Sequence, residues 1–117
     1  MAIAEYWQRG EALDYVNSTE AVIPANTIVT IGSRIGVTGG PIAPGETGVL
    51  HVGGVWDMPK TGSSAITIGT TVYFDGTGIT DEANDGADSD PESYIEVGYA
   101  AANAAAAATT ILVKLRG

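Results

Sequence analysis

Short apolar runs, separated by glycine, proline or asparagine roughly every 8–12 residues, are the feature that most restricts how this chain can fold. The runs are rich in valine, isoleucine and threonine, which occur 10, 11 and 13 times, whereas leucine occurs only four times. β-Branched side chains pack well on a pleated sheet and lose rotamer freedom in a helix. The 16 glycines suit the turns between such runs. The sequence therefore predicts a mainly β protein.

The length of 117 residues predicts a single domain, because domains cluster near this size. We expect an N-terminal arm over residues 1–10 and one β domain over residues 11–117, with an acidic loop at 81–92. The candidate strands are residues 13–16, 27–31, 33–37, 48–55, 66–68, 71–75, 94–99 and 110–115. Between the last two strands, the alanine-rich residues 100–108 are too short for a stable isolated helix and predict a loop or one helical turn.

The net charge of −9, from five basic and 14 acidic residues, argues against nucleic acid and anionic membrane surfaces as partners. Binding to a polyanion needs lysine and arginine to displace counterions from phosphates. The N-terminal ten residues contain no apolar run suited to a signal peptide, so we expect synthesis in the cytoplasm. Residues 97–113 carry no charged side chain, but eight of the 17 are alanine, which contributes too little hydrophobicity to carry a segment across a membrane.

The absence of cysteine excludes disulfides, thiolate metal sites and cysteine nucleophiles. His51 has no second histidine to complete a metal site or a catalytic pair. Gly54 to Thr61 resembles a phosphate-binding loop, but Pro59 replaces a required glycine and has no N–H to offer a phosphate. Lys60 and a nearby serine lack the surroundings of a catalytic dyad. We therefore predict no enzyme, no catalytic residues and no cofactor.

The acidic loop at 81–92 partly matches a calcium-binding pattern. Asp81, Asp85, Gly86 and Glu92 fit an EF-hand loop, whereas Ala83 occupies a ligand position and neither flank reads as a helix. Eight of the 14 acidic residues lie within residues 75–96, which contain no base, and charges this dense resist burial. A mobile, solvated loop is the favoured interpretation, with no metal site predicted and weak surface binding of a divalent cation left as the alternative.

Six short motifs occur in an order that spans nearly the whole chain: residues 6–15 (YWQRGEALDY), 34–37 (RIGV), 42–48 (IAPGETG), 54–60 (GVWDMPK), 65–75 (AITIGTTVYFD) and 98–101 (GYAA). Together they resemble the small phage and prophage capsid decoration proteins, also called cement proteins. The chain departs from that pattern in its acidic insertion near residues 81–91 and in residues 104–108, where alanine stands at a position that is commonly glycine.

The resemblance implies a small β-barrel or β-tulip-like domain that binds the exterior of a viral capsid at capsomer junctions and stabilises the mature shell. Its implied partners are the major capsid protein and further copies of itself, usually as a homotrimer on local threefold positions. It also implies a location on the outside of the virion after synthesis in the host cytoplasm, and no catalysis.

We expect the main capsid contact in residues 2–14, which have no long alternation and precede the first confident strand. Such an arm can add a strand to an open sheet edge of the shell protein. The candidate contact residues are Ile3, Tyr6, Trp7, Arg9 and Trp56. The alternative for this segment is a short first strand packed on its own domain.

A second function stays open on the sequence alone. Trp7, Trp56, Tyr73 and Tyr99 could act as stacking platforms of a carbohydrate-binding or host-surface-binding module. Such a module would bind glycans as an isolated protein, whereas a cement protein would bind only assembled shells. A metal-dependent hydrolase ranks last.

Overall fold

The computed structural model describes residues 2–6, 10–87, 89 and 91–116. These residues form two antiparallel sheets and no helix, so the predicted mainly β fold is confirmed. The strands are β1 (Ala12–Val16), β2 (Ile28–Ile31), β3 (Arg34–Thr38), β4 (Thr47–His51), β5 (Val55–Pro59), β6 (Thr71–Phe74), β7 (Ile79–Thr80), β8 (Ile95–Ala100) and β9 (Thr110–Leu115).

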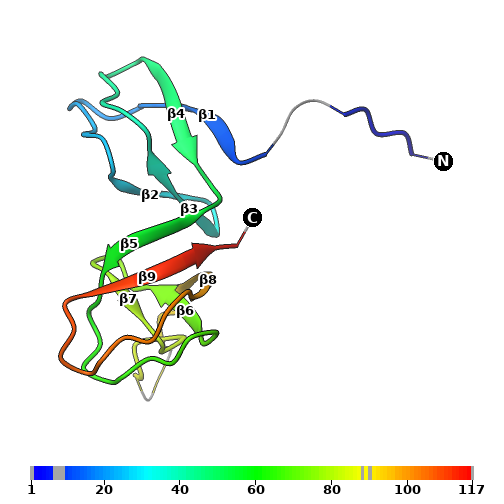
Figure 1. Cartoon of the computed structure of the whole chain (residues 1–117). Helices are drawn as coiled ribbons and strands as arrows, with labels where there is room; N and C mark the ends of the chain where they lie inside the picture. Colours follow the sequence, from blue (N-terminus) through cyan, green and yellow to red (C-terminus); the bar gives the residue numbers. More distant parts are fainter. Residues whose placement is uncertain (1, 7–9, 88, 90, 117) are drawn as a thin grey trace.

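The two sheets follow one another along the chain. A four-stranded sheet has the order β1-β4-β3-β2, and a five-stranded sheet has the order β5-β9-β8-β6-β7. They occupy the upper and lower halves of Figure 1, and β3 packs against β8 where they meet. The chain crosses from one sheet to the other at residues 52–54, where Gly54 has a φ of 91°. The prediction of one strand over residues 48–55 is therefore wrong, because β4 and β5 belong to different sheets.

The five-stranded sheet approaches closure but does not reach it. Lys60, just after β5, forms an isolated parallel bridge with Ile79 of β7, and the N–H of Thr61 donates to the carbonyl of Ile79 at 2.9 Å. The two edge strands of this sheet thus touch at one end only. No closed barrel is found in the part of the chain that the structure describes, so the barrel or tulip expectation is not confirmed.

Each sheet has a corner built from two similar turns. In each corner two residues exchange backbone hydrogen bonds, Ile23 with Ile42 and Ile66 with Ala104, and a tight turn follows each of the four. The predicted strand at residues 66–68 is thereby reduced to a single bridge. The corners give the two halves of the chain a common local plan, although the sequence has no repeat of fixed period.

The third residue after each bridging residue shows how the turn in the alanine run at residues 104–108 differs from the other three turns. At three of the four positions φ is positive: 63° at Asn26, 80° at Gly45 and 88° at Gly69. Ala107 occupies the fourth position, and Asn26 is the one non-glycine residue with positive φ among those described. Alanine disfavours that conformation, and Ala107 does not adopt it, although the N–H of Ala108 and the carbonyl of Ala105 close this turn at 3.0 Å as the equivalent groups do in the turns at Gly45 and Gly69. The alanine run is thus a loop rather than a helical turn.

The main core lies mostly within the five-stranded half. Ten of its twelve buried residues come from residues 58–115, and Ile35 and Val37 of β3 supply the other two. The ten are Met58, Ile66, Val72, Ile79, Val97, Ala100, Ala104, Ile111, Val113 and Leu115. This distribution makes the five-stranded sheet the main source of hydrophobic stabilisation.

Candidate interaction surfaces

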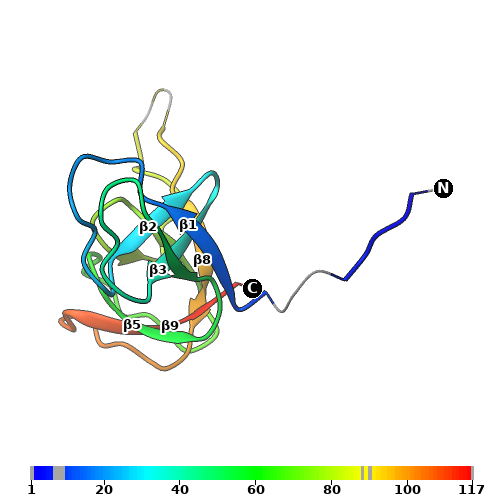
Figure 2. The same cartoon turned by 90° about the horizontal axis from the view of Figure 1, so that it is seen from above.

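Residues 2–6 extend away from both sheets (Figures 1 and 2). Within the described part of the chain they form no strand and no hydrogen bond. The side chains of Ile3 and Tyr6 are 86% and 83% exposed, more than any other large apolar side chain described. The segment therefore offers free backbone donors and acceptors together with apolar side chains, which are the two requirements for strand addition to a partner.

The other predicted arm residues have different outcomes. Trp7 and Arg9 lie outside the described residues, so nothing is said of their positions. Ala12–Val16 is β1, which pairs with β4 through Leu13 opposite Leu50, so the end of the predicted 2–14 contact segment is already part of a sheet. The extent of the arm and its role as the capsid contact stay predictions.

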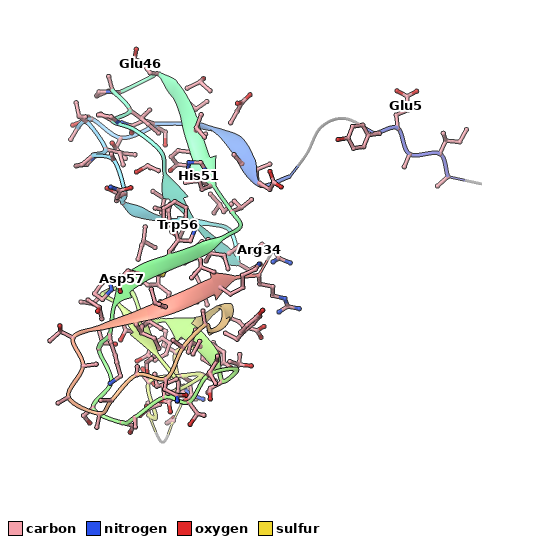
Figure 3. All side chains as sticks on the ribbon, in the orientation of Figure 1. Glu5, Arg34, Glu46, His51, Trp56 and Asp57 are labelled. Carbon is pink, nitrogen blue, oxygen red and sulfur yellow. The ribbon has the colours of Figure 1, made fainter. Side chains whose placement is uncertain are left out.

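Trp56, the remaining predicted contact residue, lies at the junction of the two sheets. Its side chain is half-buried, its Nε1–H donates to the carbonyl of Gly53 at 2.8 Å, and its ring centroid lies 5.4 Å from that of His51 (Figure 3). His51 ends β4 and Trp56 lies in β5, so the ring pair spans the crossing segment. The geometry gives both side chains a structural contact, and a role for Trp56 in partner binding stays untested.

A hollow of about 330 Å³ lies beside Trp56, lined by residues of both sheets. Ile28 and Val37 contribute from the four-stranded sheet, and Met58 and Pro59 contribute from β5. β5 pairs with β9 on one side only, so its other edge borders this hollow. Pro59 suits an edge strand because it has no N–H to leave unpaired.

The outward-facing side of the five-stranded sheet presents a second apolar surface. We call Val55, Asp57, Tyr99, Leu112 and Lys114 the outer sheet face. Val55 and Tyr99 lie opposite Lys114 on its two flanking strands, and Asp57 lies opposite Leu112. Directly opposed side chains point to the same side of a sheet.

The exposure of the outer sheet face follows from the alternation of the strands. Ile111, Val113 and Leu115 of β9 are buried in the core, so the residues between them must face outward. Val55 is 56% exposed, Tyr99 48% and Leu112 43%. Sequence reasoning missed this surface, although the alternation of residues 110–115 contained its signal.

The acidic loop is organised as a short hairpin around Asp85. Asn84 and Ser93 form an isolated antiparallel bridge, and the N–H of Asp85 donates to the carbonyl of Glu92 at 3.1 Å. Oδ1 of Asp85 accepts from the N–H of Ala87 at 3.0 Å and of Glu92 at 3.2 Å, so this carboxylate holds the turn. Among the described residues, no three acidic or histidine side chains form a group that could hold a metal ion.

A polar hollow of about 270 Å³ lies beside this hairpin, lined by Thr61, Ser63, Asp75, Tyr94 and others. Burial acts to raise the pKa of Asp75, but hydrogen bonds from the Thr61 hydroxyl and from the N–H groups of Gly78 and Thr77 outweigh it and lower the pKa. Burial, followed by the negative charge of Asp85, raises the pKa of Tyr94. Both shifts move the groups away from neutral pH, where a general acid or base would need to titrate.

The residues that resemble a phosphate-binding loop and a catalytic dyad have structural roles in the fold. Residues 55–59 of the apparent phosphate loop form β5, whose backbone pairs with β9. The Nζ of Lys60 donates to the carbonyls of Gly62 at 2.7 Å and Ala106 at 3.2 Å, and thereby ties the alanine turn to the end of β5.

No described segment forms a helix of the length and apolarity that a membrane crossing requires.

Comparison with known proteins identifies the family. The model of the phage cement proteins matches residues 7–115, which include every strand of both sheets. The chain belongs to the phage cement protein family. No curated protein and no solved structure matches the chain. Membership gives the protein a structural role in association with a phage capsid and a location in the virion, and it confirms the resemblance seen in the sequence.

Proposed function

We propose that this protein binds the exterior of a phage capsid at the junctions between capsomers and stabilises the mature shell without catalysing a reaction. The family match over residues 7–115 is the observation that carries the proposal. The major capsid protein is the partner, and three copies act together on each local threefold position. The protein is made in the host cytoplasm and ends on the outside of the virion.

Binding alone is sufficient for stabilisation. A ligand that binds the assembled lattice but not its separated subunits shifts the equilibrium toward the lattice by mass action. Three linked copies that contact several capsomers raise the effective concentration of every individual contact. Weak contacts can therefore produce strong shell stabilisation.

The arm is the proposed capsid contact, through Ile3, Tyr6, Trp7 and Arg9. The exposure of Ile3 and Tyr6 and the free backbone of residues 2–6 support this role. An open edge of a shell protein sheet could pair with that backbone, and the exposed side chains would add apolar contact. Tryptophan and arginine, the residue types at positions 7 and 9, are enriched at binding hot spots.

The acidic loop is proposed to face the solvent when the protein is bound. Its hairpin leaves the body in a different direction from the arm in both views (Figures 1 and 2). Desolvating its carboxylates against a surface without matching positive charge would be costly. An arm on the shell and a loop pointing elsewhere are compatible with one bound orientation.

The carbohydrate-binding alternative has weaker support. Trp56 and Tyr73 are half-buried, and the indole N–H of Trp56 is already hydrogen-bonded within the protein. Tyr99 is the most exposed of the proposed platforms that the structure describes, at 48%. Among the proposed platform residues that the structure describes, Tyr99 is therefore the one exposed ring available for stacking on a sugar.

Co-sedimentation with undecorated capsids tests the proposal and the arm together. The double variant Ile3→Ser, Tyr6→Ser should lose at least about tenfold in affinity for shells, because two apolar contacts are removed. Its melting temperature should stay unchanged, since neither side chain packs on the body. The control is Val22→Ser, which removes a side chain that is 56% exposed elsewhere and should bind like wild type. Absence of wild-type binding would overturn the proposed function, and normal binding by the double variant would overturn the arm as the contact.

A further inference from the structure

The outer sheet face combines exposed apolar side chains with a rigid support. Val55, Tyr99 and Leu112 lie on three adjacent strands, and each is between 43% and 56% exposed. The strands beneath them are fixed by the buried side chains of Met58, Ile111 and Val113 and their neighbours. Little conformational freedom would be lost if a partner covered this face, so the burial of its apolar area would not be offset by ordering.

The outer sheet face is balanced in charge, although the chain as a whole is acidic. Two copies, each with a net charge of −9, repel one another, but salt limits the repulsion to charges within about 8 Å at physiological ionic strength. The outer sheet face carries one acid, Asp57, and one base, Lys114. At the end of β9, Arg116 forms an ion pair with Glu96 of β8. Copies can therefore approach this face without meeting an excess of like charge.

The four-stranded sheet offers an instructive contrast. Val16 and Val49 are 54% and 48% exposed, so that sheet also has an apolar surface. On this surface the acidic Asp14 lies directly opposite Val49, and neither residue has a lysine or arginine opposite it in the pairing of β1 with β4. Apolar exposure alone does not separate the two surfaces, whereas charge balance does.

The charge balance and the apolar side chains together suit a second copy of this chain, because an acidic copy can approach this face without meeting an excess of like charge. We infer that the outer sheet face is the surface through which copies of this protein contact one another. The inference rests on the proposed trimeric, capsid-bound state and names the surface through which the three copies contact one another. In a cyclic trimer this face meets a different patch of the neighbouring copy, so a neutral surface serves better than an acidic one, which the neighbour's net charge of −9 would repel.

The size of the face predicts a modest affinity. Three strands spaced about 4.8 Å apart and about six residues long span roughly 300 Å². A stable interface takes about 800 Å² from each partner, so this face supplies less than half of one. Association should then be weak in solution and become strong on the shell, where neighbouring copies are held at high local concentration.

Two double variants with the same change in charge test the inference in solution. Leu112→Ser with Lys114→Glu removes an apolar side chain and a base from the outer sheet face. Val49→Ser with Arg34→Glu makes matching changes at exposed positions of the four-stranded sheet, and both variants have the same net charge. Sedimentation equilibrium up to millimolar concentration should show self-association weakened about tenfold by the first variant and hardly changed by the second. Equal effects of the two variants would overturn the inference.

A second measurement applies if association requires the shell. The chain has no cysteine, so Leu112→Cys introduces a single thiol. On decorated shells, a short maleimide–diazirine crosslinker attached to this thiol should join it on illumination to the neighbouring copy and give dimers, whereas Val49→Cys copies should stay separate. Wild-type protein that is monomeric at every concentration, together with Leu112→Cys protein that binds shells but never crosslinks to another copy, would overturn the inference. Those results would leave the proposed function intact, because shell binding is scored separately.

Discussion

The two sheets of this protein reach stability by different means. The five-stranded sheet encloses most of the apolar core, including Val72, Ile79 and Val113, which have no measurable exposure. The four-stranded half relies on close approach at glycine and on two fully buried polar residues, Asn17 and Thr38. A Cβ at Gly36 would meet the side chain of Leu50 at 2.5 Å, and a Cβ at Gly48 would overlap Ile42.

Asn17 makes more side-chain hydrogen bonds than Thr38, the other buried polar residue of the four-stranded half. Its Nδ2 donates to the carbonyls of Ala21 and Ile42, each at 2.8 Å, and its Oδ1 accepts from the N–H and the hydroxyl of Thr19. The side chain is fully buried and uses all of these bonds to hold the loop after β1 against the corner at Ile42. The comparison teaches that one half is stabilised mainly by hydrophobic burial and the other by a few specific polar and glycine contacts.

The largest expected effect is in the five-stranded half. In Gly98→Ala the new Cβ would overlap the carbonyl oxygen of Lys114, and the φ of 150° at this position is unfavourable for alanine. β8 and β9 would have to separate, which should lower the free energy of unfolding by about 3 kcal/mol or more. Urea denaturation measures the change.

Gly40→Ala is the control for that substitution, because no atom lies within 4 Å of the new Cβ. It should change the free energy of unfolding by less than about 1 kcal/mol. If Gly98→Ala were equally mild, the tight β8–β9 pairing described above would be incorrect.

The second effect sharpens the comparison from the other half. Asn17→Ala removes the four hydrogen bonds and leaves the carbonyl of Ile42 without its side-chain donor, which should cost about 2 kcal/mol. Hydrogen exchange should accelerate in the four-stranded sheet while β8 and β9 stay protected. The same substitution at Asn103, an exposed residue that accepts one bond from the N–H of Ile68, should cost less than about 1 kcal/mol. If hydrogen exchange accelerated equally in both sheets, the two sheets would unfold as one unit, and the proposed difference in how they are stabilised would be wrong.

The smallest effect concerns pH and the five-stranded half. Because the pKa of Asp75 is lowered in the folded protein, its ionised form stabilises the fold above the ordinary pKa of 3.8. That stabilisation is lost as pH falls through the lowered value. The melting temperature of Asp75→Asn should therefore lie slightly below that of wild type at neutral pH, and the gap should narrow below about pH 4.

Thr61→Val checks the cause of this pH effect, since the Thr61 hydroxyl is one of the groups that lower the pKa of Asp75. The variant should lose stability at neutral pH in the same direction as Asp75→Asn. A constant gap between wild type and Asp75→Asn from pH 7 to pH 3 would contradict this assignment.

Strands with a local signal could be predicted from the sequence. Residues 110–115 alternate between buried and exposed side chains, and the prediction coincides with β9. The strands β2 and β3 were also predicted, as residues 27–31 and 33–37, and Gly32 between them has a φ of 61°, which suits the turn of the hairpin that they form. Local propensity and local structure agree in these segments.

Features that depend on tertiary arrangement could not be predicted. Val52 and Gly53 read as a continuation of β4, and only the position of the second sheet ends that strand at His51. The two-residue strand β7 has too few residues to give a pattern. The corners were hidden because Asn26, Gly45, Gly69 and Ala107 occupy equivalent positions with three residue types.

The arm and the outer sheet face also differ in how far the sequence alone indicates them. The arm was indicated by a mixed composition without alternation, which the sequence displays directly. The outer sheet face depends on which strands are neighbours, because Val55, Tyr99 and Leu112 are far apart in the chain and adjacent only in the sheet. Sequence patterns show which residues of a strand share a side, but not which strands lie together.

Electron cryomicroscopy of undecorated capsids incubated with the protein tests the central claim most directly. The account predicts added density on the outside of the shell at capsomer junctions, with the arm against the major capsid protein, the outer sheet faces between neighbouring copies and the acidic loop toward solvent. Absence of added density, or density in which the arm points into solvent and the acidic loop lies on the shell, would contradict the account.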